Sequence, residues 1–185
     1  MVYILLGAGF EESEALVTAD VLRRADLPVT LTGIGGSTVT GSHNITVLAD
    51  QPVEKVSLKA GDMVVLPGGM GGVASMEHSA AAMKLIRQAA DDTEMKIAAI
   101  CAAPTLLARA RLLPVGLPCV CYPGMEGELK EVGADPRMDQ STVTQENYIT
   151  GRGPGSAFDF GLALVEALAG RSAAERVRAG LVYQP

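Results

Sequence analysis

The sequence contains few aromatic residues and no concentration of positive charge. Aromatic residues make up 4% of the 185 residues and tryptophan is absent, whereas hydrophobic residues make up 48%. We therefore expect a globular protein whose core is built mainly from alanine, valine and leucine. The formal net charge is −6, and the lysines and arginines are scattered. Because nothing would neutralise a run of phosphates, we do not expect nucleic acid as a partner.

Long apolar segments are also missing. The first run, residues 1–6, has no basic lead-in and is soon followed by Glu11 and Glu12. It is too short for a membrane span, which needs ~20 apolar residues, and it does not resemble a signal peptide. We interpret it as a buried strand and expect a cytoplasmic protein without a membrane partner, with residues 1–185 forming a single domain.

Cysteine and histidine are scarce. An odd number of cysteines, Cys101, Cys119 and Cys121, without a secretion signal indicates a reducing compartment. Cys119 and Cys121 would share one face of a strand, but the only histidines are His43 and His78 and no second pair of metal ligands exists. We interpret the pair as ordinary thiols and expect no metal and no cofactor; a redox or metal role for the pair is the alternative.

Short β-rich runs alternate with helical stretches. We predict strands over residues 2–6, 28–34, 62–66, 96–100, 118–121 and within 142–150, a hairpin over 38–41 and 44–48, and helices over 12–25, 79–91, 104–111, 157–169 and 172–179. In the last helix, Ser172 and Glu175 match a capping box. Apolar strands alternating with helices imply a mostly parallel sheet covered on both faces, with the functional crevice beyond the carboxyl ends of the strands.

Cys101 follows one of the buried strands. Its surroundings predict a strand, a sharp turn and a helix with Pro104 in the first turn. The helix N-terminus would stabilise a thiolate and lower the pKa of Cys101, and neighbouring alanines would leave the sulfur approachable. A buried structural cysteine is the alternative interpretation.

Glu14 lies on the apolar stripe of the first helix, together with Val21. A carboxylate there is costly unless it is paired or protonated. A protonated Glu14 could donate a hydrogen bond to Cys101 and move protons. The alternative is a solvated carboxylate in the first turn of the helix, a description that fits Glu11 and Glu12 better.

Gly68 and Gly69 follow the strand over residues 62–66. Glycines there permit unusual backbone angles, so that the N–H of Gly69, with that of Ala102, could hold an oxyanion; a flexible connection is the alternative. Residues 69–74 also fit the loose pattern G-x-G-x-x-A of a nucleotide-binding module, which is a weak signal alone. The earlier Gly-Ala-Gly has Glu12 where a third glycine belongs.

Five motifs, in this order, resemble the DJ-1/ThiJ/PfpI superfamily, and most closely its Parkinson-disease-associated DJ-1 branch. They are EESE at 11–14, DVLRRA at 20–25, VVLPGG at 64–69, AAICAAP at 98–104 and GRGPGSAF at 151–158. The resemblance implies an α/β fold, a flavodoxin-like three-layer sandwich of the class I glutamine amidotransferase-like kind, which forms a homodimer. It implies that Cys101 is the nucleophile and the oxidation-sensitive thiol, that Glu14 is its protonated partner, and that Gly69 and Ala102 supply the oxyanion donors.

Other positions match the superfamily only in part. Arg24 and Arg152 match basic residues near the pocket or the dimer interface. Tyr122 stands where the superfamily often has a pocket histidine, and tyrosine is a poor base near pH 7. Ala102 stands where the protease-like branch has histidine, so we do not expect a peptidase. His43 takes a basic hairpin position and is otherwise expected to be a solvated turn residue.

The resemblance implies glyoxalase III activity (methylglyoxal to lactate without glutathione), repair of glycated adducts, or redox-linked chaperoning. We expect an enzyme that uses Cys101 and Glu14 on a small aldehyde. The alternative is a redox sensor or chaperone in which Cys101 oxidises and nothing turns over. A nucleotide-binding module is the third hypothesis.

Overall fold

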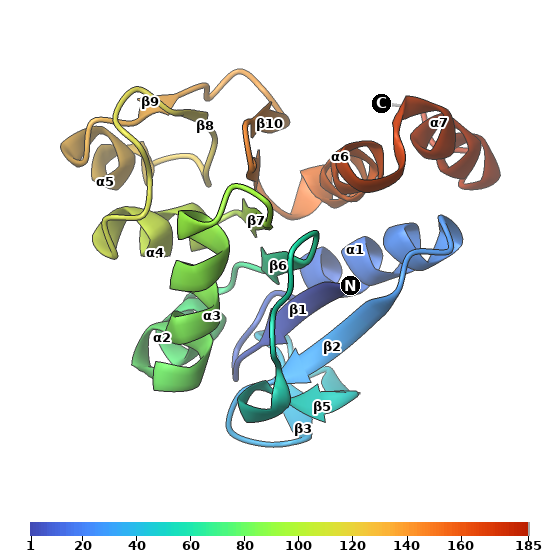
Figure 1. The fold of residues 1–185 in the computed structure, drawn as a ribbon, viewed down its shortest axis with the longest axis horizontal. Helices are drawn as coiled ribbons and strands as arrows, with labels where there is room; N and C mark the ends of the chain where they lie inside the picture. Colours follow the sequence, from blue (N-terminus) through green and yellow to red (C-terminus); the bar gives the residue numbers. More distant parts are fainter. Residues whose placement is uncertain (185) are drawn as a thin grey trace.

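The computed structural model describes residues 1–184, and a seven-stranded sheet runs through it (Figure 1). The strand order is β10-β11-β7-β6-β1-β2-β5. These strands are β1 (Val2–Leu6), β2 (Val29–Gly33), β5 (Gln51–Pro52), β6 (Met63–Leu66), β7 (Lys96–Ile100), β10 (Thr142–Gln145) and β11 (Tyr148–Gly151). All neighbours are parallel except β10 and β11. The prediction of a mostly parallel sheet is confirmed.

Helices cover both faces of this sheet (Figure 1). On one face, α1 (Glu12–Arg24) packs against α6 (Ala157–Ala169), which also contacts α7 (Arg171–Gly180). The other face carries α3 (Ala80–Asp91) and α4 (Ala103–Arg109), with α2 (Met70–His78) packed against both and α5 (Glu126–Glu131) packed against α4. The expected flavodoxin-like sandwich is confirmed. Two small ribbons pair β3 (Thr38–Thr40) with β4 (Thr46–Leu48), and β8 (Pro118–Cys119) with β9 (Asp135–Pro136).

The core is aliphatic, as the composition predicts. Every residue of β6 is buried, and Ile97 and Ile100 of β7 are fully buried, because each central strand is covered by helices on both sides. Phe10 and Phe160 are the largest side chains that are fully enclosed. Among residues 1–184, no helix has both the length and the apolar character needed to cross a bilayer.

Two local predictions are wrong. The last helix, α7, begins at Arg171. Gly170, with a φ of +83°, is both the C-cap of α6 and the N-cap of α7. Ser172 therefore lies inside the helix, and its hydroxyl accepts a hydrogen bond from Arg176 instead of forming a capping box. The strand predicted over 118–121 is shorter, because β8 ends at Cys119.

Two helices, α2 and α5, were not predicted from the sequence. Helix α2 contains Gly71 and Gly72, which disfavour a helix by about 1 kcal/mol each relative to alanine. The structure shows why glycine is needed there: a Cβ on Gly72 would lie 2.7 Å from the Cα of Phe10. Close approach of two backbones therefore outweighs helix propensity in this segment.

The contact between α1 and α6 gives a stability prediction. A Cβ on Gly161 would lie 2.9 Å from the Cβ of Val21, so Gly161→Ala overpacks this interface. We expect it to lower the free energy of unfolding by about 1–3 kcal/mol. Gly127 in α5 has open space around it, and Gly127→Ala should be neutral or stabilising by up to ~1 kcal/mol. Urea unfolding of both variants measures the difference; equal effects would contradict the packing argument.

Candidate active site

The parallel strands β1, β6 and β7 end at the same edge of the sheet, where three connections meet. Cys101 directly follows β7 and has a φ of +65°, in the left-handed region that residues other than glycine seldom adopt. Such a conformation costs on the order of 1–3 kcal/mol. Two backbone hydrogen bonds hold it: Cys101 N donates to Gly151 O (2.9 Å), and Tyr122 N donates to Cys101 O (2.8 Å). The sharp turn before α4 is thus fixed by two neighbouring segments.

Glu14 lies behind the thiol and is almost completely enclosed, with 1% of its surface exposed. Its Oε2 accepts a hydrogen bond of 2.7 Å from Gly68 N, and its carboxyl lies beside the Cys101 thiol. Its Oε1 is buried without a hydrogen-bond partner of ordinary geometry among the described residues. A buried carboxylate oxygen without a donor is costly, so this environment favours the protonated acid. Burial raises the pKa of Glu14 to about 7.

The thiol of Cys101 is coupled to this carboxyl. Burial raises the pKa of Cys101 to about 12, and the charge of Glu14 adds to the rise, whereas the N–H groups of Ala102 and Gly69 lower it. The sequence-based expectation of a lowered pKa is therefore wrong, because burial is the largest effect on this thiol. Once Glu14 is protonated, its charge no longer opposes the thiolate, so the two groups titrate as a pair.

Two glycines make this arrangement possible. A Cβ on Gly68 would lie 2.7 Å from both the Cβ of Cys101 and the Oε2 of Glu14, so any side chain would separate the pair. Gly69 has a φ of +81°, and its N–H faces the sulfur together with that of Ala102. This turn therefore presents the N–H groups of Gly69 and Ala102 at the position where a negatively charged oxygen could develop.

The sulfur faces a cavity of about 720 Å³. Cys101 itself is 8% exposed, and the walls include Met70, Met125 and Tyr122. Tyr122, which is 48% exposed, lies at the cavity because its backbone is hydrogen-bonded to Cys101. The structure thus brings to the site the tyrosine that replaces the superfamily's histidine.

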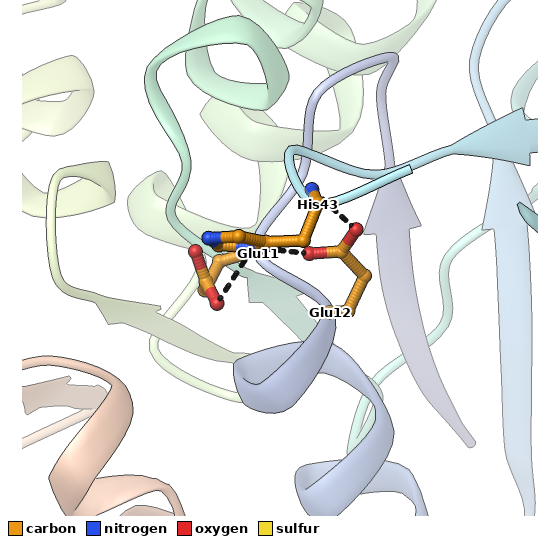
Figure 2. Close-up of side chains that lie close together, drawn as sticks. All are labelled: Glu11, Glu12 and His43. Carbon is orange, nitrogen blue, oxygen red and sulfur yellow. Dashed lines mark hydrogen bonds and ion pairs between the residues drawn. The ribbon is translucent and has the colours of Figure 1, made fainter. Parts of the chain in front are cut away.

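Glu11 and His43 line this cavity on the side of the β3–β4 hairpin, and Glu12 lies beside them (Figure 2). Glu12 is buried, contrary to the expectation of a solvated carboxylate. Its Oε1 accepts from His43 N (2.7 Å) and Ile45 N (3.3 Å), and its Oε2 lies 3.0 Å from His43 Nδ1. Burial opposes ionisation of Glu12, but the His43 ring and the backbone donors outweigh it and lower the pKa to about 2. The hydrogen bond to Glu12 raises the pKa of His43, which is exposed as expected.

Glu11, Glu12 and His43 are also the candidate ligands for a bound cation. Within the part of the chain that the structure describes, they are the one group whose metal-ligating atoms come together, within 4.8 Å of one another. Both carboxylate oxygens of Glu12 are already engaged by the hairpin. We therefore interpret the group as a set of hydrogen bonds that holds the hairpin against α1.

The two arginines singled out in the sequence lie in different places. Arg24 pairs with Asp20 at the far end of α1, ten residues beyond Glu14 and so roughly 15 Å away along the helix. It lines a separate hollow beside Arg176, away from the cavity at Cys101, so of the two expected places, the pocket and the dimer interface, only the second stays a prediction. Arg152 follows β11 and lines a cavity that adjoins the one at Cys101.

Two weaker sequence signals receive no support from the geometry. In the segment over 69–74, a Cβ on Gly69 or Gly72 would collide with the backbone of residues 9–11, so close packing accounts for these two glycines without a phosphate. Cys119 and Cys121 are fully buried, and burial raises the pKa of each thiol, to about 11 and about 12. Both behave as ordinary core thiols.

A thiol on a left-handed turn between a parallel strand and a helix, backed by a buried carboxyl, is the geometry of an α/β protein with a nucleophilic cysteine. The chain belongs to the DJ-1/PfpI family, whose model matches residues 1–167. It is 40% identical to Protein dj-1beta of Drosophila melanogaster over 181 residues, which cover 97% of this chain and 95% of that protein.

The crystal structure of Drosophila melanogaster DJ-1beta superposes with a TM-score of 0.92 at 38% identity, covering 100% of this chain and 98% of that one. A second relative, the "Glutathione-independent glyoxalase DJR-1.2" of Caenorhabditis elegans, is 31% identical over 164 residues, covering 86% of this chain and 83% of that protein. The resemblance seen in the sequence motifs is thereby confirmed.

The burial of Glu14 predicts a specific pH dependence of stability. Because its pKa rises from 4.5 to about 7 on folding, the folded state holds the proton more tightly. The resulting stabilisation is complete below pH 4.5 and is lost as the pH rises through 7, by about 3 kcal/mol in all. Glu14→Gln stays neutral, so wild type should lose stability relative to it between pH 5 and pH 8. Urea unfolding at both values tests this; a constant difference would contradict it.

Proposed function

We propose that this protein is a cysteine-dependent enzyme that converts a 2-oxoaldehyde such as methylglyoxal into the 2-hydroxy acid without glutathione, or that reverses the corresponding glycated adducts. One observation carries the proposal: a carboxyl with a pKa of about 7 lies beside the Cys101 thiol at the wall of a cavity. The printed activity of the Caenorhabditis elegans relative supports the same chemistry.

The reaction is an internal oxidation and reduction followed by hydrolysis. The Cys101 sulfur bonds to the aldehyde carbon, and the carbonyl π electrons become a lone pair on oxygen that the N–H groups of Gly69 and Ala102 stabilise. The proton on that carbon then moves to the neighbouring carbonyl carbon through an enediolate. The first carbon is thereby oxidised to a thioester while the second is reduced to an alcohol. Water cleaves the C–S bond, returns a proton to sulfur and releases the hydroxy acid.

Glu14 is the group that moves the protons in this scheme. A pKa near 7 lets it both accept and release a proton near neutral pH, which a carboxyl with an ordinary pKa does poorly. Tyr122 contributes a hydroxyl donor to the second carbonyl oxygen, because its phenol is a poor base. The enzyme would then manage the transfer without the histidine that many superfamily members have.

Lactate formation from methylglyoxal tests the proposal. We expect Cys101→Ala and Glu14→Gln each to lower kcat/KM by at least about 100-fold, because each removes a group that touches the reacting atoms. Cys119→Ala is the matched control, since it removes a buried thiol away from the cavity. Wild-type rates in the first two variants would exclude the mechanism.

A second candidate is a redox sensor, and it is favoured by the difference in exposure among the thiols. Cys101 reaches the cavity, whereas Cys119 and Cys121 are completely enclosed. Two equivalents of peroxide would convert the thiolate to a sulfinate with release of two waters, and the added oxygens would meet the N–H groups of Gly69 and Ala102.

Intact mass and peptide mapping after dilute peroxide separate the two candidates. A gain of about 32 Da, the mass of two oxygen atoms, that is confined to Cys101 and accompanied by no aldehyde turnover favours the sensor. Turnover that is abolished by this oxidation favours the enzyme. Oxidation spread equally over Cys119 and Cys121 would count against any special role for the site.

We also propose that the protein works as a homodimer, as the family resemblance implies, and that it lies in the cytoplasm. The three cysteines are unpaired, which suits a reducing compartment.

A further inference from the structure

A second cavity, of about 350 Å³, adjoins the one that holds the Cys101 sulfur. The two share Tyr122, Pro123 and Pro154 in their walls, so they are lobes on either side of these residues. The second lobe is lined further by Ser141, Arg152, Asp159 and the turn over 153–156. A molecule that extends beyond its reacting aldehyde can therefore continue into this lobe.

Arg152 is placed directly beside the nucleophile by the sheet. Cys101 N donates to Gly151 O at 2.9 Å, and Arg152 is the next residue along the chain. Its own N–H donates to Ser141 O (3.0 Å), which fixes the backbone from which the side chain enters the second lobe. The guanidinium thus belongs to a segment that the Cys101 turn itself anchors.

The charge of Arg152 has no partner within residues 1–184. Its guanidinium forms neither an ion pair nor a side-chain hydrogen bond there, whereas the guanidinium groups of Arg23, Arg24, Arg109, Arg137 and Arg178 pair with carboxylates. Arginine keeps its charge at any relevant pH and binds a carboxylate through two parallel N–H donors. In a chain of net charge −6, this is a cation available to a ligand.

Negative charge on the opposite side of the cavity also favours binding of an anion at Arg152. Glu11 lies there, and His43 is already engaged by Glu12. Asp159 is the acidic group of the second lobe, and its Oδ1 accepts the hydroxyl of Tyr183 at 3.0 Å. Arg152 is therefore the group best placed to receive the negative end of a substrate.

We propose that Arg152 and its lobe form a carboxylate-binding subsite, which makes anionic 2-oxoaldehydes such as 4,5-dioxopentanoate better substrates than neutral ones of equal size. The reactive aldehyde lies at Cys101 and the carboxylate at the guanidinium. The proposal deepens the function proposed above and rests on it for its kinetic readout.

Kinetics with a matched pair of substrates tests the subsite. Wild type should show a kcat/KM about tenfold higher for 4,5-dioxopentanoate than for its neutral amide, the effect of one charge-assisted contact. Arg152→Gln should abolish this ratio, Arg152→Lys should keep part of it, and Asp159→Asn should increase it. Arg176→Gln, a change of equal charge on α7, should leave the ratio as in wild type. A ratio unaffected by Arg152→Gln and Asp159→Asn overturns the proposal.

A binding measurement separates failure of the subsite from failure of the enzyme hypothesis. 4-Oxopentanoate has the carboxylate but no aldehyde, so it can be titrated into Cys101→Ala by calorimetry. Binding that weakens about tenfold in Cys101→Ala/Arg152→Gln supports the subsite even when no substrate turns over. Absence of binding to Cys101→Ala, with turnover of methylglyoxal intact in wild type, overturns the subsite alone.

Discussion

The hydrogen bond from Gly68 to Glu14 is the interaction on which the site depends. It draws a carboxyl from the first helix under the turn that follows β6, to a position that solvent does not reach. A carboxyl held there ionises only near neutral pH, and its proton has the sulfur of Cys101 as its neighbour. The remaining features protect this contact: Gly68 leaves space for both side chains, and the β7–β11 pairing orients the thiol.

Much of the fold and of the candidate site could be predicted from the sequence, because the patterns that mark them lie within short segments. Apolar runs bounded by glycine and proline mark β1, β6 and β7, and parallel strands place their carboxyl ends together. A glutamate on the apolar stripe of α1 signals burial by its position alone. The proposal that Cys101 is the nucleophile follows from these elements together with the family motifs.

The parts that could not be predicted depend on contacts between distant segments. Glu12 looks like an ordinary helix-start acid, and only the returning hairpin shows that it is a buried acceptor of two backbone N–H groups. The raised pKa of Cys101 could not be predicted, because the burial that outweighs the helix N-terminus comes from tertiary packing. Helix α2 could not be predicted because its glycines disfavour a helix locally, and their close packing against Phe10 appears only in the folded chain.

Because the backbone of Cys101 is left-handed, the arrangement around its thiol depends on contacts from the rest of the fold. The conformation is unfavourable by itself and persists because Gly151 and Tyr122, far away in the sequence, each hold one side of the peptide. When either contact opens, the residue can relax into an extended conformation, and the two N–H donors no longer face the sulfur. A chain in which these contacts are open would therefore carry a cysteine without the two facing donors, so the arrangement at the sulfur exists only in the folded protein.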